Sequence, residues 1–296
     1  MSNSILTKKI LYWYDNNKRV LPWRKKISQT KREYYTLVSE FMLQQTQVTT
    51  VIPYFNNFIR DIPNLTSLSK INESKLLKYW EGLGYYSRVK NLQKTAQNVE
   101  KNFKGKIPST IEQLKSLPGI GDYTANAIMA IAFNKPFIPL DGNIERVIKR
   151  LLNLKQVDEI SKQNLVREKK IFGTSIRSSD YAQALMELGA LVCRPRNPLC
   201  KKCPLTKNCK SFKKNDFEII KPKRKKIDKF YLVEVYKKNS KFLLIKNTKF
   251  NFLKNLIIFP MKEIPKPNNL DKPLNFKMSN MNMNVVIKFT KIKSIV

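Results

Sequence analysis

Two acidic residues stand in settings that favour opposite protonation states. Glu40 lies in residues 38–48, a mostly uncharged helical pattern in which partial burial would raise its pKa and favour proton donation. Asp141 lies in residues 139–146, a loop entering a helix, where an N-cap position would keep it ionised through amide hydrogen bonds. One protonated and one ionised carboxyl group is the pair that cleaves glycosidic bonds. A solvated helical acid and a plain cap are the alternative interpretations, since residues 101 positions apart need not meet.

All four cysteines fall within one short stretch, Cys193, Cys200, Cys203 and Cys209, with the spacing C-x6-C-x2-C-x5-C. Clustered cysteines without a secretory signal point to a metal site rather than to disulfides. Four thiolates suit tetrahedral zinc or an iron–sulfur cluster. Zinc ribbons usually pair two C-x2-C knuckles, and only one such pair is present here. A chance grouping of buried cysteines is the remaining alternative. The nearby Arg194 and Arg196 would either contact DNA phosphates or be solvated.

The charge balance makes a polyanionic partner plausible. Lys and Arg total 57 against 22 acidic residues, a formal charge of +35. Part of this excess fits a gene that drifted toward A and T, because the chain is rich in Lys, Asn and Ile. Histidine is absent, which excludes an imidazole base and histidine metal ligands. Residues 1–13 do not form a signal peptide, and no apolar run could span a membrane, so we expect a soluble intracellular protein.

A glycine-rich turn indicates contact with DNA. Leu117-Pro-Gly-Ile-Gly121 precedes the alanine-rich helical pattern of residues 122–130. Gly119 and Gly121 would allow a tight turn that brings the backbone amides close to an anion. This pattern is typical of a helix–hairpin–helix, which holds DNA phosphate without reading sequence. An ordinary helix–helix turn is the alternative.

These residues need a helical body to position them. Apolar residues recur at helical spacing from about residue 4 to about residue 190, with breaks expected at Pro53, Pro63, Pro108 and the glycine turns. Ser109 and Glu112 form a capping-box pattern. The sequence therefore predicts a mostly α fold over residues 1–212, with the cysteine module at 193–209.

A smaller region follows a basic linker. Residues 213–229 are rich in Lys and Pro. Repulsion between the positive charges favours an extended, exposed linker. Residues 230–236 and 242–245 read as two strands joined by a polar turn, and 256–259 and 285–289 as further strands. We expect a small α+β domain over residues 230–296.

Together these motifs resemble the adenine DNA glycosylase branch of the helix–hairpin–helix, endonuclease-III-like glycosylases. Residues 39–55 resemble the catalytic-acid helix of that branch, Gly82-Leu-Gly-Tyr-Tyr-Ser-Arg88 resembles its mismatch-probing turn, and Leu140-Asp-Gly-Asn143 and residues 184–190 also match. The resemblance is strong over about residues 6–209. The spacing of the four cysteines matches the cluster loop of this superfamily. The resemblance therefore implies that they hold a structural [4Fe–4S] cluster.

The resemblance also implies roles for individual residues. Glu40 would protonate the adenine ring and Asp141 would stabilise the sugar cation, supported by Tyr123 and Asn143. Arg24 and Glu187 would line the adenine pocket. Gln45 and Tyr85 would wedge into the duplex, although Tyr85 could instead be a core aromatic residue. The endonuclease-III branch has a lysine where this chain has Tyr123, and a phenol cannot form an imine. We therefore expect base release without efficient strand cleavage.

The C-terminal region resembles a shortened Nudix-like domain that reads 8-oxoguanine. Residues 253–260 are similar to its Leu–Trp–x–Phe–Pro region, with Ile257 in place of tryptophan. Phe289, Thr290 and Lys291 fall where the family has a Phe–Ser–His loop. Because Lys291 replaces histidine, we expect a weakened preference for 8-oxoguanine over guanine opposite adenine.

The expected substrate is double-stranded DNA with adenine opposite 8-oxoguanine or guanine, bound by a monomer in a bacterial-type cytoplasm at the nucleoid. Two rival functions stay open: a glycosylase for oxidised pyrimidines, and a non-catalytic DNA-binding relic. Tyr123 and the C-terminal region weigh against the first, and the intact acids and cysteines weigh against the second.

Overall fold

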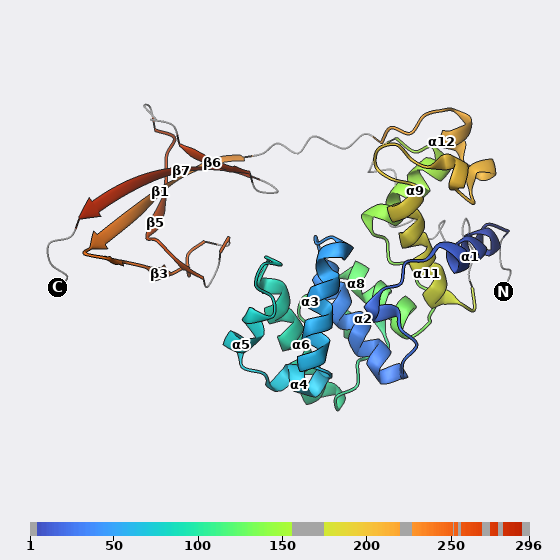
Figure 1. The fold of residues 1–296 in the computed structure, drawn as a ribbon, viewed down its shortest axis with the longest axis horizontal. Helices are drawn as coiled ribbons and strands as arrows, with labels where there is room; N and C mark the ends of the chain where they lie inside the picture. The colour runs from blue at the N-terminus through green and yellow to red at the C-terminus, as the bar shows by residue number, and fades with distance from the viewer. Residues whose placement is uncertain are drawn as a thin grey trace. The chain divides into compact units, whose positions relative to one another are not determined.

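The computed structural model describes residues 5–155, 175–219, 227–250, 252–253, 256–267, 273–277 and 281–291. The chain divides into two compact units, Met1–Lys221 and Pro222–Val296 (Figure 1). The first unit is helical, and the described part of the second consists of strands and loops. The predicted linker lies partly outside the described residues, at 220–226. Among the helices of the described ranges, none is long and apolar enough to cross a membrane.

The helical unit is built from short helices joined by tight turns. In chain order its elements are α1 (Ile5–Asn17), η1 (Pro22–Arg24), α2 (Gln29–Leu43), α3 (Val48–Asp61), α4 (Leu65–Lys70), α5 (Glu73–Lys78), α6 (Ser87–Phe103), α7 (Ile111–Lys115), α8 (Asp122–Ala127), η2 (Ile128–Ala132), α9 (Gly142–Leu152), α11 (Ser178–Glu187), η4 (Leu188–Val192), η5 (Cys200–Lys202), η6 (Thr206–Asn208) and α12 (Lys210–Lys213). Two of these, η2 and η4, are π-helical turns that continue α8 and α11.

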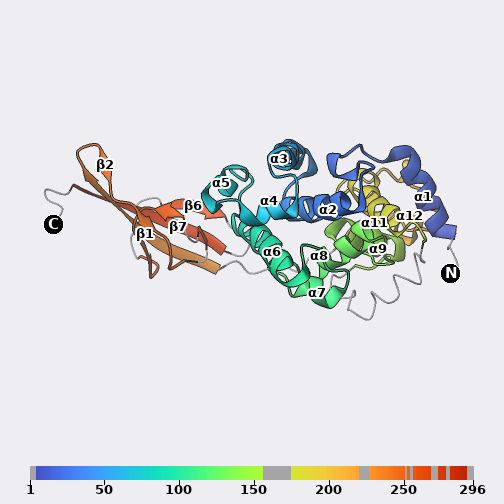
Figure 2. The ribbon, with the colours of Figure 1, turned by 90° about the horizontal axis from the view of Figure 1, so that it is seen from below.

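The apolar core of this unit has two parts. The larger part packs α2, α3, α6 and α8 around side chains such as Phe41, Phe55 and Trp80. The smaller part packs α1, α9 and α11 around Tyr14, Ile148 and similar side chains, and three of the four cysteines pack against it, Cys193, Cys203 and Cys209. Figures 1 and 2 both show α4, α5 and α6 toward one side of the unit and α1, α9 and α11 toward the other. Side chains from α2 and from α9 can therefore meet where the two parts adjoin.

The predicted hairpin lies between α7 and α8. Gly119 has a φ of +81°, and a Cβ there would lie 2.9 Å from both the Asn91 and Phe41 side chains. A side chain at this position would thus be strained and would clash. Gly121 has an extended backbone, and a Cβ there would meet nothing within 4 Å. Only the first of the two glycines is sterically required.

Two local expectations were wrong. Pro53 lies inside α3 rather than ending it, because the apolar face of this helix packs into the larger core and outweighs the missing backbone donor. The cap of α7 is Thr110 rather than Ser109: its hydroxyl accepts a hydrogen bond from the amide of Gln113. The helix therefore begins one residue later than the Ser109–Glu112 pattern indicated.

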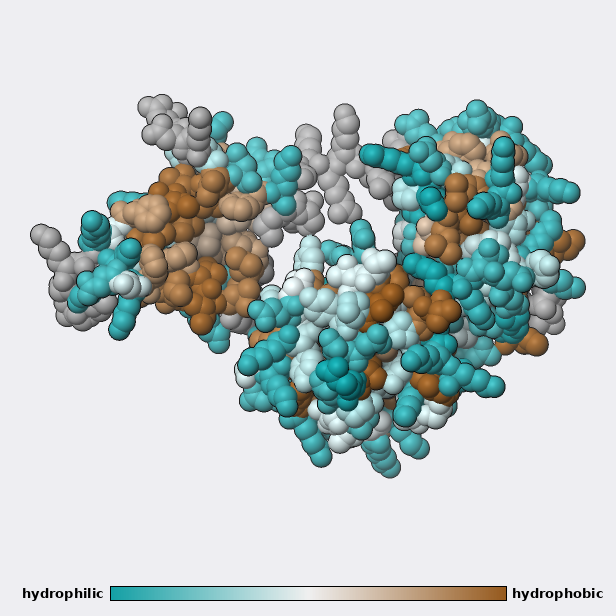
Figure 3. Space-filling view, viewed as in Figure 1, coloured by the Kyte–Doolittle hydropathy of each residue, from teal (hydrophilic) through white to brown (hydrophobic). Residues whose placement is uncertain are grey.

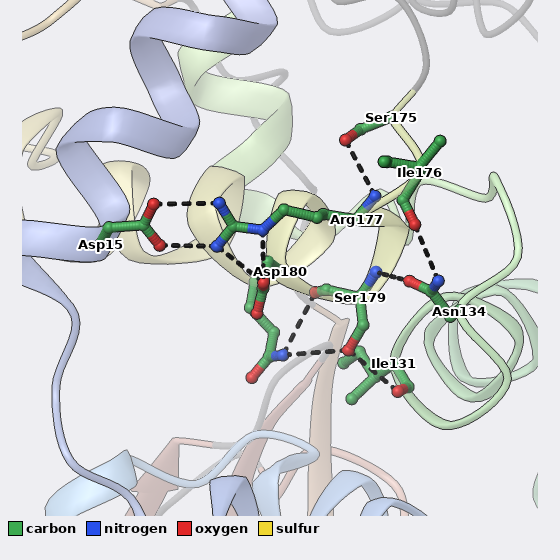
Figure 4. Close-up of polar contacts among 9 residues, drawn as sticks. Asp15, Ile131, Asn134, Ser175, Ile176, Arg177, Ser179 and Asp180 are labelled. Atoms are coloured by element: carbon green, nitrogen blue, oxygen red, sulfur yellow. Dashed lines mark hydrogen bonds and ion pairs between the residues drawn. The ribbon is translucent and has the colours of Figure 1, made fainter.

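Polar contacts hold the start of α11 to other parts of the unit (Figure 4). The guanidinium of Arg177 donates to both carboxylate oxygens of Asp15 on α1, at 2.6 and 3.0 Å, and to Asp180 at 2.8 Å. The side chain of Asn134 accepts from the amide of Ser179 at 2.9 Å and donates to the carbonyl of Ile176 at 2.8 Å. These contacts fix the helix that ends at Glu187.

The second unit contains a mixed sheet. Its strands are β1 (Ile227–Lys238), β2 (Lys241–Phe242), β3 (Ile245–Lys246), β4 (Ile257–Ile258), β5 (Met261–Ile264), β6 (Leu274–Lys277) and β7 (Met281–Lys291). The sheet order is β2-β1-β7-β6, with β5 also paired to β1, and β3 pairs with β4. The long strands β1 and β7 are parallel, from Ile227 opposite Met281 to Lys237 opposite Lys291.

The predicted strands agree only in part with this sheet. Residues 230–236 and 285–289 lie within β1 and β7, whereas 256–259 shortens to β4 and 242–245 is divided between β2 and β3. Strands β5 and β6 were not predicted, because each is four residues long and mixes Lys, Glu or Asn with its apolar positions.

Figure 3 shows apolar residues over much of the visible face of this unit, and among its described residues few large side chains are buried.

Candidate active site

Glu40 lies on the face of α2 that turns into the protein, and it is 4% exposed. Burial raises the pKa of its carboxyl group to about 7, although a hydrogen bond with Tyr123 acts in the opposite direction. The negative charge of Asp141 also raises this pKa, and the positive charge of Arg24 lowers it. Glu40 Oε2 is buried and has no hydrogen-bond partner among the described residues. The side chain can therefore carry and donate a proton near neutral pH.

Asp141 is the N-cap of α9, as its position before the helix predicted. Its carboxylate accepts hydrogen bonds from the amides of Asn143 and Ile144, at 3.0 and 2.7 Å, and from Asn143 Nδ2 at 2.8 Å. Burial nevertheless raises its pKa above the usual value, against these hydrogen bonds and the charge of Arg146. The hydrogen bonds favour the ionised form, as expected for a cap, and burial opposes them.

The two acids meet in one cavity of about 890 Å³. Its lining includes Thr36, Gln183 and seven of the predicted polar residues: Arg24, Glu40, Gln45, Tyr123, Asp141, Asn143 and Glu187. The pKa of Tyr123 is raised well above its usual value, chiefly by burial and then by the two acids. Its phenol is therefore neutral and can donate to Glu40.

Glu187 is fully buried, at 0% exposure, yet it is held in the ionised form. Burial raises its pKa, but the hydrogen bond and charge of Arg19 and the charge of Arg24 outweigh burial, and the net pKa is lowered. Arg19 donates to both carboxylate oxygens at 2.6 to 3.1 Å, and Arg24 Nη2 donates to Oε1 at 3.0 Å. Arg24 Nε and Nη1 are buried without a partner in the described structure, so two donor groups remain for a ligand.

Arg19 was missed at the sequence level. Nothing local separates it from the other basic residues of a chain with 57 Lys and Arg residues. Its importance follows only from the fold, which brings the segment after α1 against the last turn of α11. If Glu187 had been recognised as a buried acid, it would have been the signal to look for a basic partner.

A close backbone contact joins α9 to the π-turn η4. A Cβ on Gly189 would lie 2.6 Å from Asn143 Cβ and 2.8 Å from the Asn143 carbonyl oxygen. Arg146 strengthens this junction: it donates to Asn143 Oδ1 at 2.7 Å and to the carbonyls of Gly189 and Cys193 at 2.8 and 2.7 Å. The position of Asn143 thus depends on both segments.

Gln45 and Tyr85 occupy turns with left-handed backbone, at φ values of 57° and 48°. Gln45 is exposed and lines the cavity, on the turn between α2 and α3. Tyr85 is 59% exposed, which rules out the alternative of a core aromatic residue. It does not line the cavity.

The four cysteines line one small apolar pocket. Two donors point at their sulfur atoms: the amide of Leu205 lies 3.4 Å from Cys203 Sγ, and Arg150 Nη1 lies 3.6 Å from Cys193 Sγ. Such donors suit thiolates. As the described side chains lie, however, no three of His, Cys, Asp or Glu form a metal-binding group. Four cysteines with hydrogen-bond donors beside their sulfur atoms suit a metal group held by thiolates. The described sulfur atoms do not lie in the arrangement that such a group requires. Arg194 and Arg196 are exposed beside the pocket.

Phe289, Thr290 and Lys291 lie at the end of β7, paired with Val235, Tyr236 and Lys237 of β1. They are therefore on a strand and not in a loop of the described structure. Phe289 is 75% exposed. Within the predicted match at 253–260, residues 254 and 255 lie outside the described residues.

Comparison with known proteins gives a consistent result. Residues 38–170 match the family described as HhH-GPD superfamily base excision DNA repair protein. The chain is 37% identical over 270 residues to an adenine DNA glycosylase of Buchnera aphidicola subsp. Schizaphis graminum, covering 88% of this chain and 76% of that protein. It is 40% identical over 209 residues to the adenine DNA glycosylase of Homo sapiens, covering 68% of this chain and 38% of that protein.

Solved structures give the fold. A thermostable thymine-DNA glycosylase superposes with a TM-score of 0.62 at 26% identity, covering 71% of this chain and 96% of that one. Endonuclease III in a non-covalent DNA complex superposes with a TM-score of 0.55 at 21% identity, covering 71% and 97%. The predicted helical glycosylase fold with a small C-terminal region of strands is confirmed.

Proposed function

Because this chain belongs to the adenine DNA glycosylase family, we propose that it releases adenine from mispaired DNA by hydrolysing the bond between base and deoxyribose. One observation carries the proposal. A buried acid with a pKa of about 7 and a second, hydrogen-bonded acid line a single cavity that also contains a paired arginine and glutamate. This is the arrangement that glycosidic cleavage requires.

The reaction needs a proton donor and an anion. Glu40 gives its proton to a ring nitrogen of adenine, so the base departs as a neutral molecule with the electrons of the broken bond. The carboxylate of Asp141 stabilises the resulting sugar cation. Water then adds to the sugar carbon and returns a proton to the enzyme. Tyr123 donates to Glu40 and Asn143 donates to Asp141, and these bonds orient both acids.

Glu187 and Arg24 are the groups we assign to the base itself. The exocyclic amine of adenine would donate to the Glu187 carboxylate, and the unpartnered N–H groups of Arg24 would donate to ring nitrogens. Tyr123 stands where a lyase needs an amine, and a phenol cannot attack the sugar to form an imine. The product should therefore be an intact strand with an abasic site.

Double-stranded DNA with adenine opposite 8-oxoguanine or guanine is the proposed substrate, bound by a monomer at the nucleoid of a bacterial-type cytoplasm. Gln45 and Tyr85 would enter the duplex and help to offset the few kcal/mol that base extrusion costs. The hairpin at Gly119 and Gly121 would hold the phosphate backbone. Phe289, Thr290 and Lys291 would contact the base opposite adenine.

The four cysteines are the proposed ligands of one [4Fe–4S] cluster, which would cross-link their loop and neutralise the thiolates together with Arg150. An iron and sulfide assay on anaerobically purified protein tests this assignment. We expect about four of each per chain. Zinc without iron would contradict the cluster.

The function is tested by single-turnover incubation with duplexes that carry adenine opposite 8-oxoguanine, guanine or thymine. We expect an alkali-sensitive abasic site in the first two duplexes, slow or absent release opposite thymine, and negligible borohydride-trapped enzyme. A fourth duplex carries an oxidised pyrimidine, and release of that base without release of adenine would favour the rival enzyme. DNA binding without release of any base would favour the non-catalytic relic.

A further inference from the structure

Arg88 is a buried arginine that joins the two turns carrying Gln45 and Tyr85. Its side chain is 7% exposed, and its guanidinium lies over the rings of Trp80 and Tyr85, at 5.4 and 5.7 Å from their centroids. It lies in the first turn of α6, where a positive charge is unfavourable to its own helix dipole. Such a charge must find its compensation elsewhere.

The compensation comes first from the end of α2. Arg88 Nη1 contacts four oxygens there: the carbonyls of Phe41, Met42 and Gln44 at 3.2, 2.9 and 2.6 Å, and Thr46 Oγ1 at 3.1 Å. The last carbonyls of a helix have no partner within the helix and attract cations. These residues directly follow Glu40 and flank Gln45.

The second group of partners lies in the turn before α6. Arg88 Nη2 donates to the carbonyls of Leu83 and Gly84, at 2.9 and 3.1 Å, and Trp80 Nε1 donates to the same Gly84 carbonyl at 3.2 Å. In the described structure none of the six hydrogen-bond acceptors of Arg88 is a carboxylate. Both linked turns contain left-handed residues, Gln45 and Tyr85, which are held there against their own backbone preference.

We propose that Arg88 is a positioning residue that fixes Gln45 and Tyr85 relative to each other and to the helix of Glu40, and so sets the efficiency of base extrusion. This inference rests on the proposed function, in which those two side chains enter the duplex. The planar guanidinium of Arg88 is needed because its two terminal nitrogens must reach carbonyls on two segments at once. The single ammonium group of lysine cannot reproduce that geometry.

The test compares Arg88→Met and Arg88→Lys with Arg60→Met, an exposed arginine on the neighbouring α3. Extrusion is measured first, by the fluorescence of 2-aminopurine opposite guanine in a duplex, which rises when the base unstacks and requires no bond cleavage. We expect the rise for wild type and Arg60→Met, at most a small rise for Arg88→Met, and an intermediate rise for Arg88→Lys.

Single-turnover rates supply the second readout. With adenine opposite guanine, we expect Arg88→Met to slow release by about tenfold or more, the loss equivalent to one charge-assisted hydrogen bond. With adenine opposite a tetrahydrofuran abasic analogue the base is unpaired, and the defect should shrink to about threefold or less, since extrusion is then cheaper. A residue needed only for folding would slow both duplexes equally.

A double-mutant cycle makes the test specific to the two turns. In a Gln45→Ala, Tyr85→Ala background, Arg88→Lys should cost much less than it does alone, because the side chains it positions are gone. Equal defects on both duplexes, additive effects in the cycle, or wild-type fluorescence in folded Arg88→Met would overturn the inference. If wild type extrudes 2-aminopurine but releases no adenine, the proposed function fails while the fluorescence comparison still decides the role of Arg88.

Discussion

At the scale of residues, the two acids of the cavity owe their properties to their partners. Glu40 has one buried oxygen without a partner and a pKa of about 7, while Asp141 has three hydrogen bonds to its carboxylate. Tyr123 forms a hydrogen bond with Glu40 and lowers the pKa of that acid. Because Glu40 is active while protonated, base release should decline as the pH rises through about 7.

Tyr123→Phe removes the hydrogen bond that favours ionised Glu40. The pKa of Glu40 should therefore rise, and the variant should keep its rate to a higher pH than the wild type. Single-turnover rates measured below and above pH 7 show where the rate declines, and Tyr35→Phe, on α2 with Glu40, is the control. If the rate of Tyr123→Phe declines at the same pH as that of the wild type, or at a lower pH, the assigned role of Tyr123 is contradicted.

Lys291→His belongs to the same scale. The shorter, stiffer imidazole loses fewer rotamers than lysine on binding a polar base edge. The variant should raise the ratio of release rates for adenine opposite 8-oxoguanine and opposite guanine, with Lys288→His on the same strand as the control. An unchanged ratio would mean that this end of β7 does not contact the opposing base.

Sequence reasoning worked best where a residue's own neighbours define its setting. The apolar segment around Glu40 and the loop before Asp141 were sufficient to predict a raised pKa and a helix cap. The rise of the Asp141 pKa could not be predicted, because its largest cause is burial in the folded protein, which the local sequence does not show. Arg19 and Arg88 could not be predicted, since only the fold separates buried arginines from many solvated ones.

At the scale of elements, the contact between the start of α9 and η4 controls the position of Asn143. Gly189 permits this approach, and alanine there would meet the Asn143 backbone at 2.8 Å. The sequence indicated both segments as motifs but gave no sign of their contact. It also misplaced the start of α7 and missed β5 and β6, where short polar strands depend on pairing with β1 and β7.

Gly189→Ala should separate α9 from η4, cost about 1–3 kcal/mol of stability through overpacking, and slow base release. Gly142→Ala is the matched control, since a Cβ there meets nothing within 4 Å and lies at the start of the same helix. Denaturant midpoints and single-turnover rates measure both effects. Equal behaviour of the two variants would show that the contact is not tight in solution.

At the scale of the whole molecule, the two units differ in their cores. The helical unit has two extensive apolar clusters. In the described part of the strand unit, the buried apolar side chains are Tyr231, Val235 and Val285. Burial of apolar surface is the main stabilising contribution to folding, so the strand unit should be the less stable.

Calorimetry should therefore show two transitions, the smaller at lower temperature. All three tryptophans, Trp13, Trp23 and Trp80, lie in the helical unit, so their fluorescence should follow only the higher transition. A single transition that coincides with the fluorescence change would show that the two units unfold together.

The central claim is that Glu40 and Asp141 act together on an adenine in the cavity, one as proton donor and one as anion. The most direct test is the single-turnover rate of adenine release for Glu40→Gln and Asp141→Asn, with Glu33→Gln on α2 as the control. The account predicts a loss of about a hundredfold or more for each of the first two, with DNA binding retained and the control unaffected. Base release at the wild-type rate by either acid variant would contradict it.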